Sequence, residues 1–104
     1  KFGYIDKVGR VVIKPQFEEA IEFSEGLAVV RIGAYYGFID RKGLVKIQPR
    51  FQGVSSFRSG VAFAPFYGDE GYINRNGEFI RRWRASDRDY PYKAPAIVTP
   101  LDKL

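Results

Sequence analysis

Two aspartates in nearly identical surroundings are the first residues of this sequence that could do chemistry. Asp6 stands in "GYIDKVG", and Asp40 stands in the later stretch "GFIDRKG". A pair of carboxyl groups at a fixed separation is what glycoside hydrolysis requires. Each aspartate, however, stands at the head of a turn, and the third copy of the motif carries Asn74, which forms turns but is no catalytic acid. We therefore interpret both aspartates as turn formers and expect no catalytic residue and no enzyme.

The residue types that usually bind transition metals are missing from the sequence. The chain has no cysteine and no histidine, so it lacks the common ligands of zinc, copper and haem and every Ser-His-Asp or Cys-His relay. The missing cysteines also leave the cellular compartment open. Calcium loops alternate oxygen ligands along a tight turn with glycine, so we expect a solvated bend, not a metal site, at Glu18, Glu19, Glu22 and Glu25. No metal and no cofactor is expected.

A dense group of cations surrounds the single tryptophan. Arg81, Arg82 and Arg84 flank Trp83 in a chain of net charge +5. The group could bind phosphates and stack a base, or it could contact an acidic protein surface, where Trp and Arg are frequent anchors. Because the charge excess is small and no nucleic-acid-binding motif is present, we favour a protein partner over a nucleic acid. In a third interpretation, Trp83 folds back and caps the last hairpin.

A repeat positions all of these side chains. Gly3, Gly37 and Gly71 follow one another at equal intervals, each before an aromatic-Ile-acid or aromatic-Ile-amide triplet. Some helical pairs repeat with the same period, about 34 residues, but prolines at mid-unit and frequent glycines break any helical stripe, and the apolar positions carry Val, Ile, Phe and Tyr. The pattern therefore predicts strands, in complete units over residues 2–35 and 36–69 and a partial unit over 70–80.

Each unit is expected to hold about three short antiparallel strands. "GYID" and "RVVI" form a hairpin whose connection runs from Asp6 to Gly9, because the aspartate accepts a turn N–H and the glycine takes a positive φ. Pro15 ends the second strand or lies on a sheet edge. "QFEEAIEF" is expected to form a bend or a single helical turn, and "LAVVRI" and "VAFAPF" the third strands.

Stacking of neighbouring units is expected to form the core. One unit of three strands cannot exclude water from both of its faces, but a neighbour stacked on it makes a continuous core. The recurring aromatic positions at its centre are Phe17, Phe23, Phe51 and Phe57. The predicted fold is all-β: tandem 34-residue repeats stacked solenoid-like or as a twisted sheet array over residues 1–84, with an irregular C-terminal tail.

The pattern resembles the WG repeat family, whose units carry an aromatic-Gly pair, Phe/Tyr-Ile-Asp, a turn with glycine, an I-x-P-x-F segment and an F-S-E-G-L-A run. The matching elements are Phe2–Asp6, Gly9, Ile13–Phe17 and Phe23–Ala28, and in the second copy Tyr36–Asp40, Gly43, Ile47–Phe51 and Phe57–Ala62. The tryptophan that names the family is replaced by Phe2, Tyr36 and Glu70. The resemblance implies tandem β-repeats that bind other macromolecules, with no catalytic residues.

The last residues, 85–104, are expected to form an extended tail. Pro91, Pro95 and Pro100 are too closely spaced for regular strands or helices, and they hold a chain in the extended geometry that suits contact with a partner surface. The chain also begins in mid-pattern at Lys1 and has no methionine, which indicates a processed product or part of a longer chain that has further repeats upstream. No stretch approaches the roughly 18 apolar residues of a membrane span.

The sequence therefore predicts a non-catalytic protein–protein interaction or assembly module, within a larger complex. The residues expected to bind the partner are Arg81, Arg82, Trp83, Arg84, Tyr90, Tyr92, Ile97, Val98 and Leu101. The alternative is a carbohydrate or cell-wall binding module in which repeated exposed aromatic rings stack on sugars. One face of each strand must be solvated, and the rings expected there are Tyr4, Tyr35, Tyr36, Phe38 and Tyr72.

Overall fold

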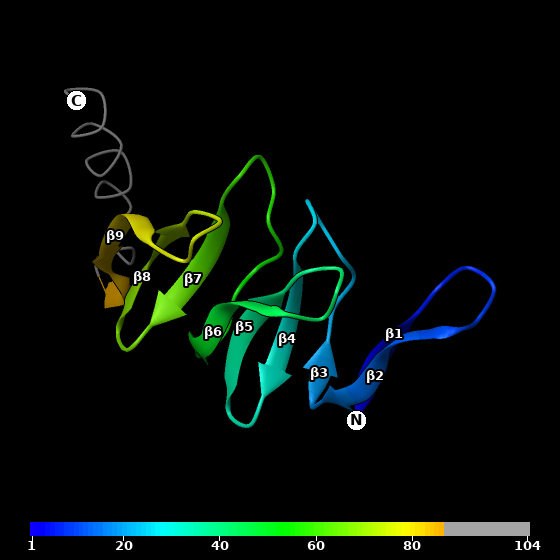
Figure 1. The fold of residues 1–104 in the computed structure, drawn as a ribbon. Helices are drawn as coiled ribbons and strands as arrows, with labels where there is room; N and C mark the ends of the chain where they lie inside the picture. The colour runs from blue at the N-terminus through cyan, green and yellow to red at the C-terminus, as the bar shows by residue number, and fades with distance from the viewer. Residues whose placement is uncertain (87–104) are drawn as a thin grey trace.

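Three antiparallel sheets follow one another along the molecule in a computed structural model that describes residues 1–86 (Figure 1). The N-terminal sheet contains β1 (Phe2–Ile5) and β2 (Val11–Phe17). The middle sheet has the order β3 (Glu19–Ala20), β4 (Ala28–Ile32), β5 (Tyr35–Ile39), β6 (Val45–Phe51). The C-terminal sheet has the order β7 (Ala62–Phe66), β8 (Asp69–Ile73), β9 (Phe79–Arg84). The predicted all-β fold of tandem repeats is confirmed.

The sheets do not coincide with the sequence units, because each unit gives its third strand to the next sheet. Val30 of β4 lies opposite Gly37 of β5, and Ala64 of β7 lies opposite Gly71 of β8. Only two residues separate β4 from β5, and the first of them, Gly33, has a φ of 64°. Two-residue connections of this kind join strands that pair directly. The middle and C-terminal sheets each therefore combine a hairpin with the last strand of the preceding unit, and the middle sheet also contains β3.

The predicted turn at the head of each repeat is confirmed in all three copies. The side-chain oxygen of Asp6, Asp40 or Asn74 accepts hydrogen bonds from the backbone N–H groups two and four residues later, at 2.9–3.0 Å. The glycine three residues after each of them has a φ between 83° and 88°. The aspartates therefore act on their own backbone, as a turn former does.

The segment between the second and third strands differs from its prediction. Glu18 forms the expected bend, but Glu19 and Ala20 then form the short strand β3 in place of a helical turn. β3 pairs with Arg31 and Val30 of β4. Pro15, expected at a strand end or a sheet edge, lies within β2, and Pro49 lies at the matching position of β6. Both are edge strands of their sheets among the described residues.

Two hydrophobic clusters separate the three sheets. One lies between the N-terminal and middle sheets and contains Ile13, Phe17, Ala28, Val30 and Ile39. The other lies between the middle and C-terminal sheets and contains Leu27, Val29, Phe38, Ile47, Phe51, Phe57, Ala62, Ala64 and Ile73. Because side chains alternate along a strand, the middle sheet contributes to both clusters and is covered on both faces. Phe17, Phe51 and Phe57 are buried as predicted, and Phe23 is partly buried.

Candidate functional site

The outer face of the C-terminal sheet, at the far end of the array from β1, has no sheet stacked on it among the described residues. Ala62, Ala64 and Ile73 point from this sheet into the core. The residues that alternate with them along each strand point to the opposite face. The register places three of these, Phe63 of β7, Tyr72 of β8 and Arg81 of β9, side by side. We call this surface, formed by Phe63, Glu70, Tyr72, Arg81 and Trp83, the end face.

Three aromatic rings form a connected cluster on the end face. The Tyr72 ring centroid lies 6.0 Å from that of Phe63 and 5.8 Å from that of Trp83, and the Phe63 and Trp83 centroids are 6.4 Å apart. Trp83 donates a hydrogen bond from Nε1 to Oε1 of Glu70 at 3.0 Å, and Glu70 is only 5% exposed. The indole ring is therefore fixed in orientation, while Tyr72 remains 41% exposed.

The corresponding surface of the middle sheet is buried. A shift by one repeat unit relates Phe63 to Val29, Tyr72 to Phe38 and Arg81 to Ile47. Val29, Phe38 and Ile47 all lie in the cluster that the C-terminal sheet covers, and none is more than 3% exposed. The end face is therefore the surface on which the next sheet of the array would stack.

The predicted basic patch is divided between the two faces of the sheet. Arg81 and Trp83 belong to the end face, whereas Arg82 lies on the opposite side, with its guanidinium over the Phe79 ring at 4.7 Å and its Nε 2.9 Å from Oδ2 of Asp69. Arg84 follows Arg82 by two residues and shares its side. The cause is strand alternation together with a register shift between Tyr72 and Ile73, which brings Phe79 and Arg82 to the same face.

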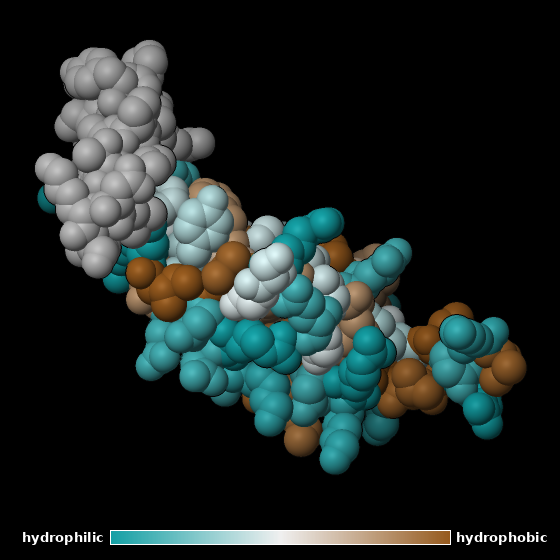
Figure 2. Space-filling view, turned by 90° about the horizontal axis from the view of Figure 1, so that it is seen from above, coloured by the Kyte–Doolittle hydropathy of each residue, from teal (hydrophilic) through white to brown (hydrophobic). Residues whose placement is uncertain are grey.

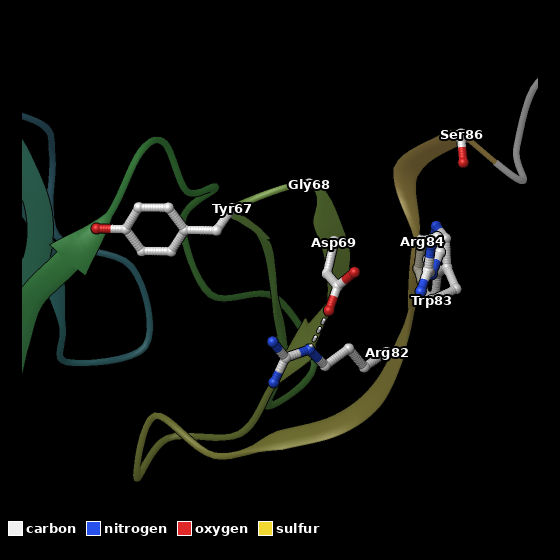
Figure 3. Close-up of a pocket in the computed structure, with 7 residues that line it drawn as sticks. All are labelled: Tyr67, Gly68, Asp69, Arg82, Trp83, Arg84 and Ser86. Carbon is white, nitrogen blue, oxygen red and sulfur yellow. Dashed lines mark hydrogen bonds and ion pairs between the residues drawn. The ribbon is translucent and has the colours of Figure 1, made fainter.

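An open pocket lies where these two sides meet at the end of β9. Tyr67, Gly68, Asp69, Arg82, Trp83, Arg84 and Ser86 line it (Figure 3). The Arg82–Asp69 ion pair closes one side, and the Tyr67 ring points away from the pocket towards the middle sheet, where its hydroxyl lies 3.1 Å from that of Tyr35. The predicted partner-binding residues Tyr90, Tyr92, Ile97, Val98 and Leu101 lie outside the described residues.

The repeat pattern of the whole array matches a known family. The family described as WG containing repeat matches two consecutive stretches, residues 2–36 and 36–64. The chain belongs to the WG repeat family. No curated protein and no solved structure matches the chain. In the described part of the chain, no helix has the length and apolar character needed to cross a membrane.

The aromatic residues proposed to bind sugar do not form one row on the WG repeats. Phe38 is fully buried, so its expected exposure is wrong, because the next sheet stacks on it. Tyr36 packs against the core and donates to the Glu19 carboxylate at 2.9 Å, and the Tyr4 hydroxyl donates to the Ile21 carbonyl at 2.7 Å. Tyr35 and Tyr72 are exposed, but they lie on different sheets.

Sequence reasoning missed two members of the end face, Phe63 and Glu70. The alternation of "VAFAPF" identifies Phe63 once the neighbouring alanines are assigned to the core. No sequence signal identifies the buried Glu70, because an acidic residue in a strand normally indicates a solvent-exposed position.

The glutamates of the first WG repeat are held by separate partners and do not converge. Glu18 accepts hydrogen bonds from Lys1 Nζ and from the Gly33 N–H, Glu19 binds Arg31, and Glu25 accepts from the backbone of the second repeat at Gly60. Among residues 1–86, no group of three acidic side chains is arranged to hold a metal ion. The glutamates therefore connect strands and repeats.

These contacts make the carboxyl groups stronger acids. The Lys1 ammonium and the Gly33 N–H lower the pKa of Glu18 from 4.5 to about 2. Arg31, followed by Tyr36, lowers the pKa of Glu19. Hydrogen bonds from the backbone, that of Leu44 first, lower the pKa of Asp40.

We expect the WG repeats to lose stability in acid. A carboxyl group whose pKa is lower in the folded chain stabilises the fold above its unfolded pKa, and this contribution is lost as the pH falls through the folded pKa. For Glu18 this stabilising contribution is lost over the pH range from 4.5 down to about 2. Melting temperatures measured at steps from pH 7 to pH 2 should be level above this range and fall within it. The Glu18→Gln variant should show a shallower fall, and equal slopes for variant and parent would contradict the assignment.

Proposed function

We propose that the chain is a non-catalytic protein–protein interaction module whose binding surface is the end face. The observation that supports this is the partial exposure of Tyr72 and Trp83 at positions where the array otherwise stacks its next sheet. Large aromatic residues gathered on one exposed sheet face indicate an interaction surface. A sheet face at the end of a repeat array also offers a broad, rigid area to a partner.

The residue types on the end face favour a protein partner over another WG repeat. Where the middle sheet presents Phe38, Ile47 and Pro49, the end face presents Tyr72, Arg81 and Trp83. Trp, Tyr and Arg are the residues most enriched at energetic anchors of protein interfaces. A purely apolar sheet stacked on this face would also remove the Tyr72 hydroxyl and the Arg81 guanidinium from water, which is unfavourable.

The end face is preorganised for binding. The hydrogen bond from Trp83 to the nearly buried Glu70 holds the indole in place, and the ring contacts with Phe63 and Tyr72 restrict it further. Side chains that are already ordered lose less entropy on binding. The net charge of +5 favours an acidic partner by electrostatic steering.

A carbohydrate ligand is the second candidate function. It is supported by the adjacent rings of Tyr72 and Trp83, whose centroids are 5.8 Å apart, and not by a row of aromatics along the repeats. Both candidates use the same rings, so the ligand class is decided by experiment.

We expect a photo-crosslinker at Tyr72 to capture a protein partner. p-Azidophenylalanine replaces tyrosine with little change in shape, and Tyr72 is 41% exposed at the centre of the aromatic cluster. The matched control is the same substitution at Tyr35, which is 37% exposed on the middle sheet. In native material, the Tyr72 position should give a discrete protein adduct that excess unlabelled chain competes away, and the Tyr35 position should not.

The affinity of the captured partner provides a second measurement. Tyr72→Ala should weaken binding about tenfold or more, because centrally placed aromatic anchors dominate interfaces, while Tyr35→Ala leaves it unchanged. If neither position gives a protein adduct, and an immobilised polysaccharide retains the parent chain but not the Tyr72→Ala variant, the carbohydrate function replaces the protein one.

A further inference from the structure

The first strand of the array has an unpaired side. β5 and β8, the strands that open the second and third hairpins, each have a neighbour on both sides, namely β4 and β6 or β7 and β9. Their counterpart β1 pairs with β2 alone among the strands of residues 1–86 (Figure 1). Its other edge therefore presents backbone N–H and C=O groups that can accept a further strand.

The side chains next to this edge have kept the residue types that the repeat uses for packing. Ile5 corresponds to Ile39 and Ile73, which are both 0% exposed, yet Ile5 is 66% exposed. Phe2, at the start of β1, is 57% exposed, whereas its counterpart Tyr36 is only partly exposed. Apolar surface is visible at this end of the molecule (Figure 2). This end thus differs from the end face, where the packing residues have been replaced.

We propose that the open edge of β1 is a strand-acceptor site, and that its ligand is the third strand of another WG repeat unit. In both other sheets, the third strand of the preceding unit pairs antiparallel with the first strand of the hairpin. The candidate donors within residues 1–86, β4 and β7, are already paired with their own hairpins. The incoming strand must therefore come from a unit other than those described.

The register of the existing sheets defines what the incoming strand must carry. Ala28 lies opposite Ile39, and Ala62 lies opposite Ile73. A small residue is thus expected opposite Ile5, followed two residues later by a small or β-branched residue opposite Gly3, as Val30 and Ala64 are opposite Gly37 and Gly71. Backbone hydrogen bonds supply affinity in this mode of binding, and the alternate side chains supply specificity.

The test uses the full chain and a synthetic peptide with the sequence of residues 25–33, "EGLAVVRIG". Peptide in large excess should slow amide hydrogen exchange of β1 about tenfold. A peptide in which the residue corresponding to Val30 is proline should not protect β1, because proline interrupts the ladder. In the chain, Ile5→Asp should abolish the protection, whereas Val8→Asp should preserve it, since Val8 is 75% exposed in the turn.

Three results would overturn the proposal. The first is unchanged exchange in β1 at saturating peptide, and the second is equal protection of the Ile5→Asp and Val8→Asp variants. The third is protection of β1 that grows with protein concentration in the absence of peptide, because that result would identify a second copy of the chain as the partner. Crosslinking at Tyr72 reports on the opposite end of the array, so either proposal can fail alone.

Discussion

Gly37→Ala is expected to lower the free energy of unfolding by about 3 kcal/mol, a large share of the roughly 5–15 kcal/mol that stabilises a domain of this size. A Cβ on Gly37 would lie 2.4 Å from the Ile47 carbonyl oxygen and 2.7 Å from the Pro49 nitrogen. Both are backbone atoms of β6, so no side-chain rotation relieves the contact. The strands would have to separate, and the pairing of β5 with β6 would be lost there.

The reason for this glycine is close approach and not an unusual backbone conformation. Gly37 has no positive φ, but the register of β5 and β6 shifts between Tyr36 and Phe38, and the shift brings the β6 backbone over the glycine. Gly3 and Gly71 are equally crowded, with backbone oxygens 2.4 Å and 2.0 Å from an added Cβ. The glycine before the aromatic-Ile pair of each copy therefore sets how closely the hairpin closes.

Thermal or urea unfolding of Gly37→Ala would measure this cost, with Gly53→Ala as the matched control. A Cβ on Gly53 meets only Pro65 Cγ at 3.8 Å, so the control should lie within about 0.5 kcal/mol of the parent chain. If the two variants unfold at the same denaturant concentration, the hairpins can open at Gly37 without cost and the close-approach argument is wrong.

The turns and the core aromatics were predictable because local chemistry determines them. An Asp or Asn followed three residues later by Gly favours this turn, and it closes the same turn at the heads of all three repeats. Phe17, Phe51 and Phe57 recur at fixed positions of the repeat, and their side chains can be buried only if neighbouring units stack. The spacing of the repeat then predicts which hydrophobic residues meet.

The boundaries of the sheets and the register of β9 depend on longer-range pairing. The two-residue connection after β4 is a signal that this strand joins the next hairpin. No residue type announces the register shift between Tyr72 and Ile73, which places Arg82 on the same face as Phe79. The separation of Arg82 from Trp83, in contrast, follows from the alternation of side chains along a strand. The short strand β3 pairs with the edge of β4 through Glu19 and Ala20.

Phe57→Ala is expected to cost about 3–5 kcal/mol, the range for removing a fully buried aromatic ring. Phe57 is 0% exposed, and its ring centroid lies 4.8 Å from that of Phe38, which is also fully buried. The cavity would lie between the middle and C-terminal sheets, whose strands on both sides are fixed by their ladders and cannot collapse into it. The backbone carbonyl of residue 57 would still accept the hydrogen bond from Ser24 Oγ, so the loss belongs to the ring.

The first repeat provides a matched control, because Phe23 occupies the same position one repeat earlier. Phe23 is only partly buried and packs on Tyr4 at 4.9 Å, beside the two-stranded N-terminal sheet. Phe23→Ala should therefore cost about 1–2 kcal/mol, since less apolar area is lost. Urea unfolding of both variants measures the difference. Equal costs would mean that the first repeat is packed as tightly as the second, and the stacking of sheets could then not explain why Phe57 matters more.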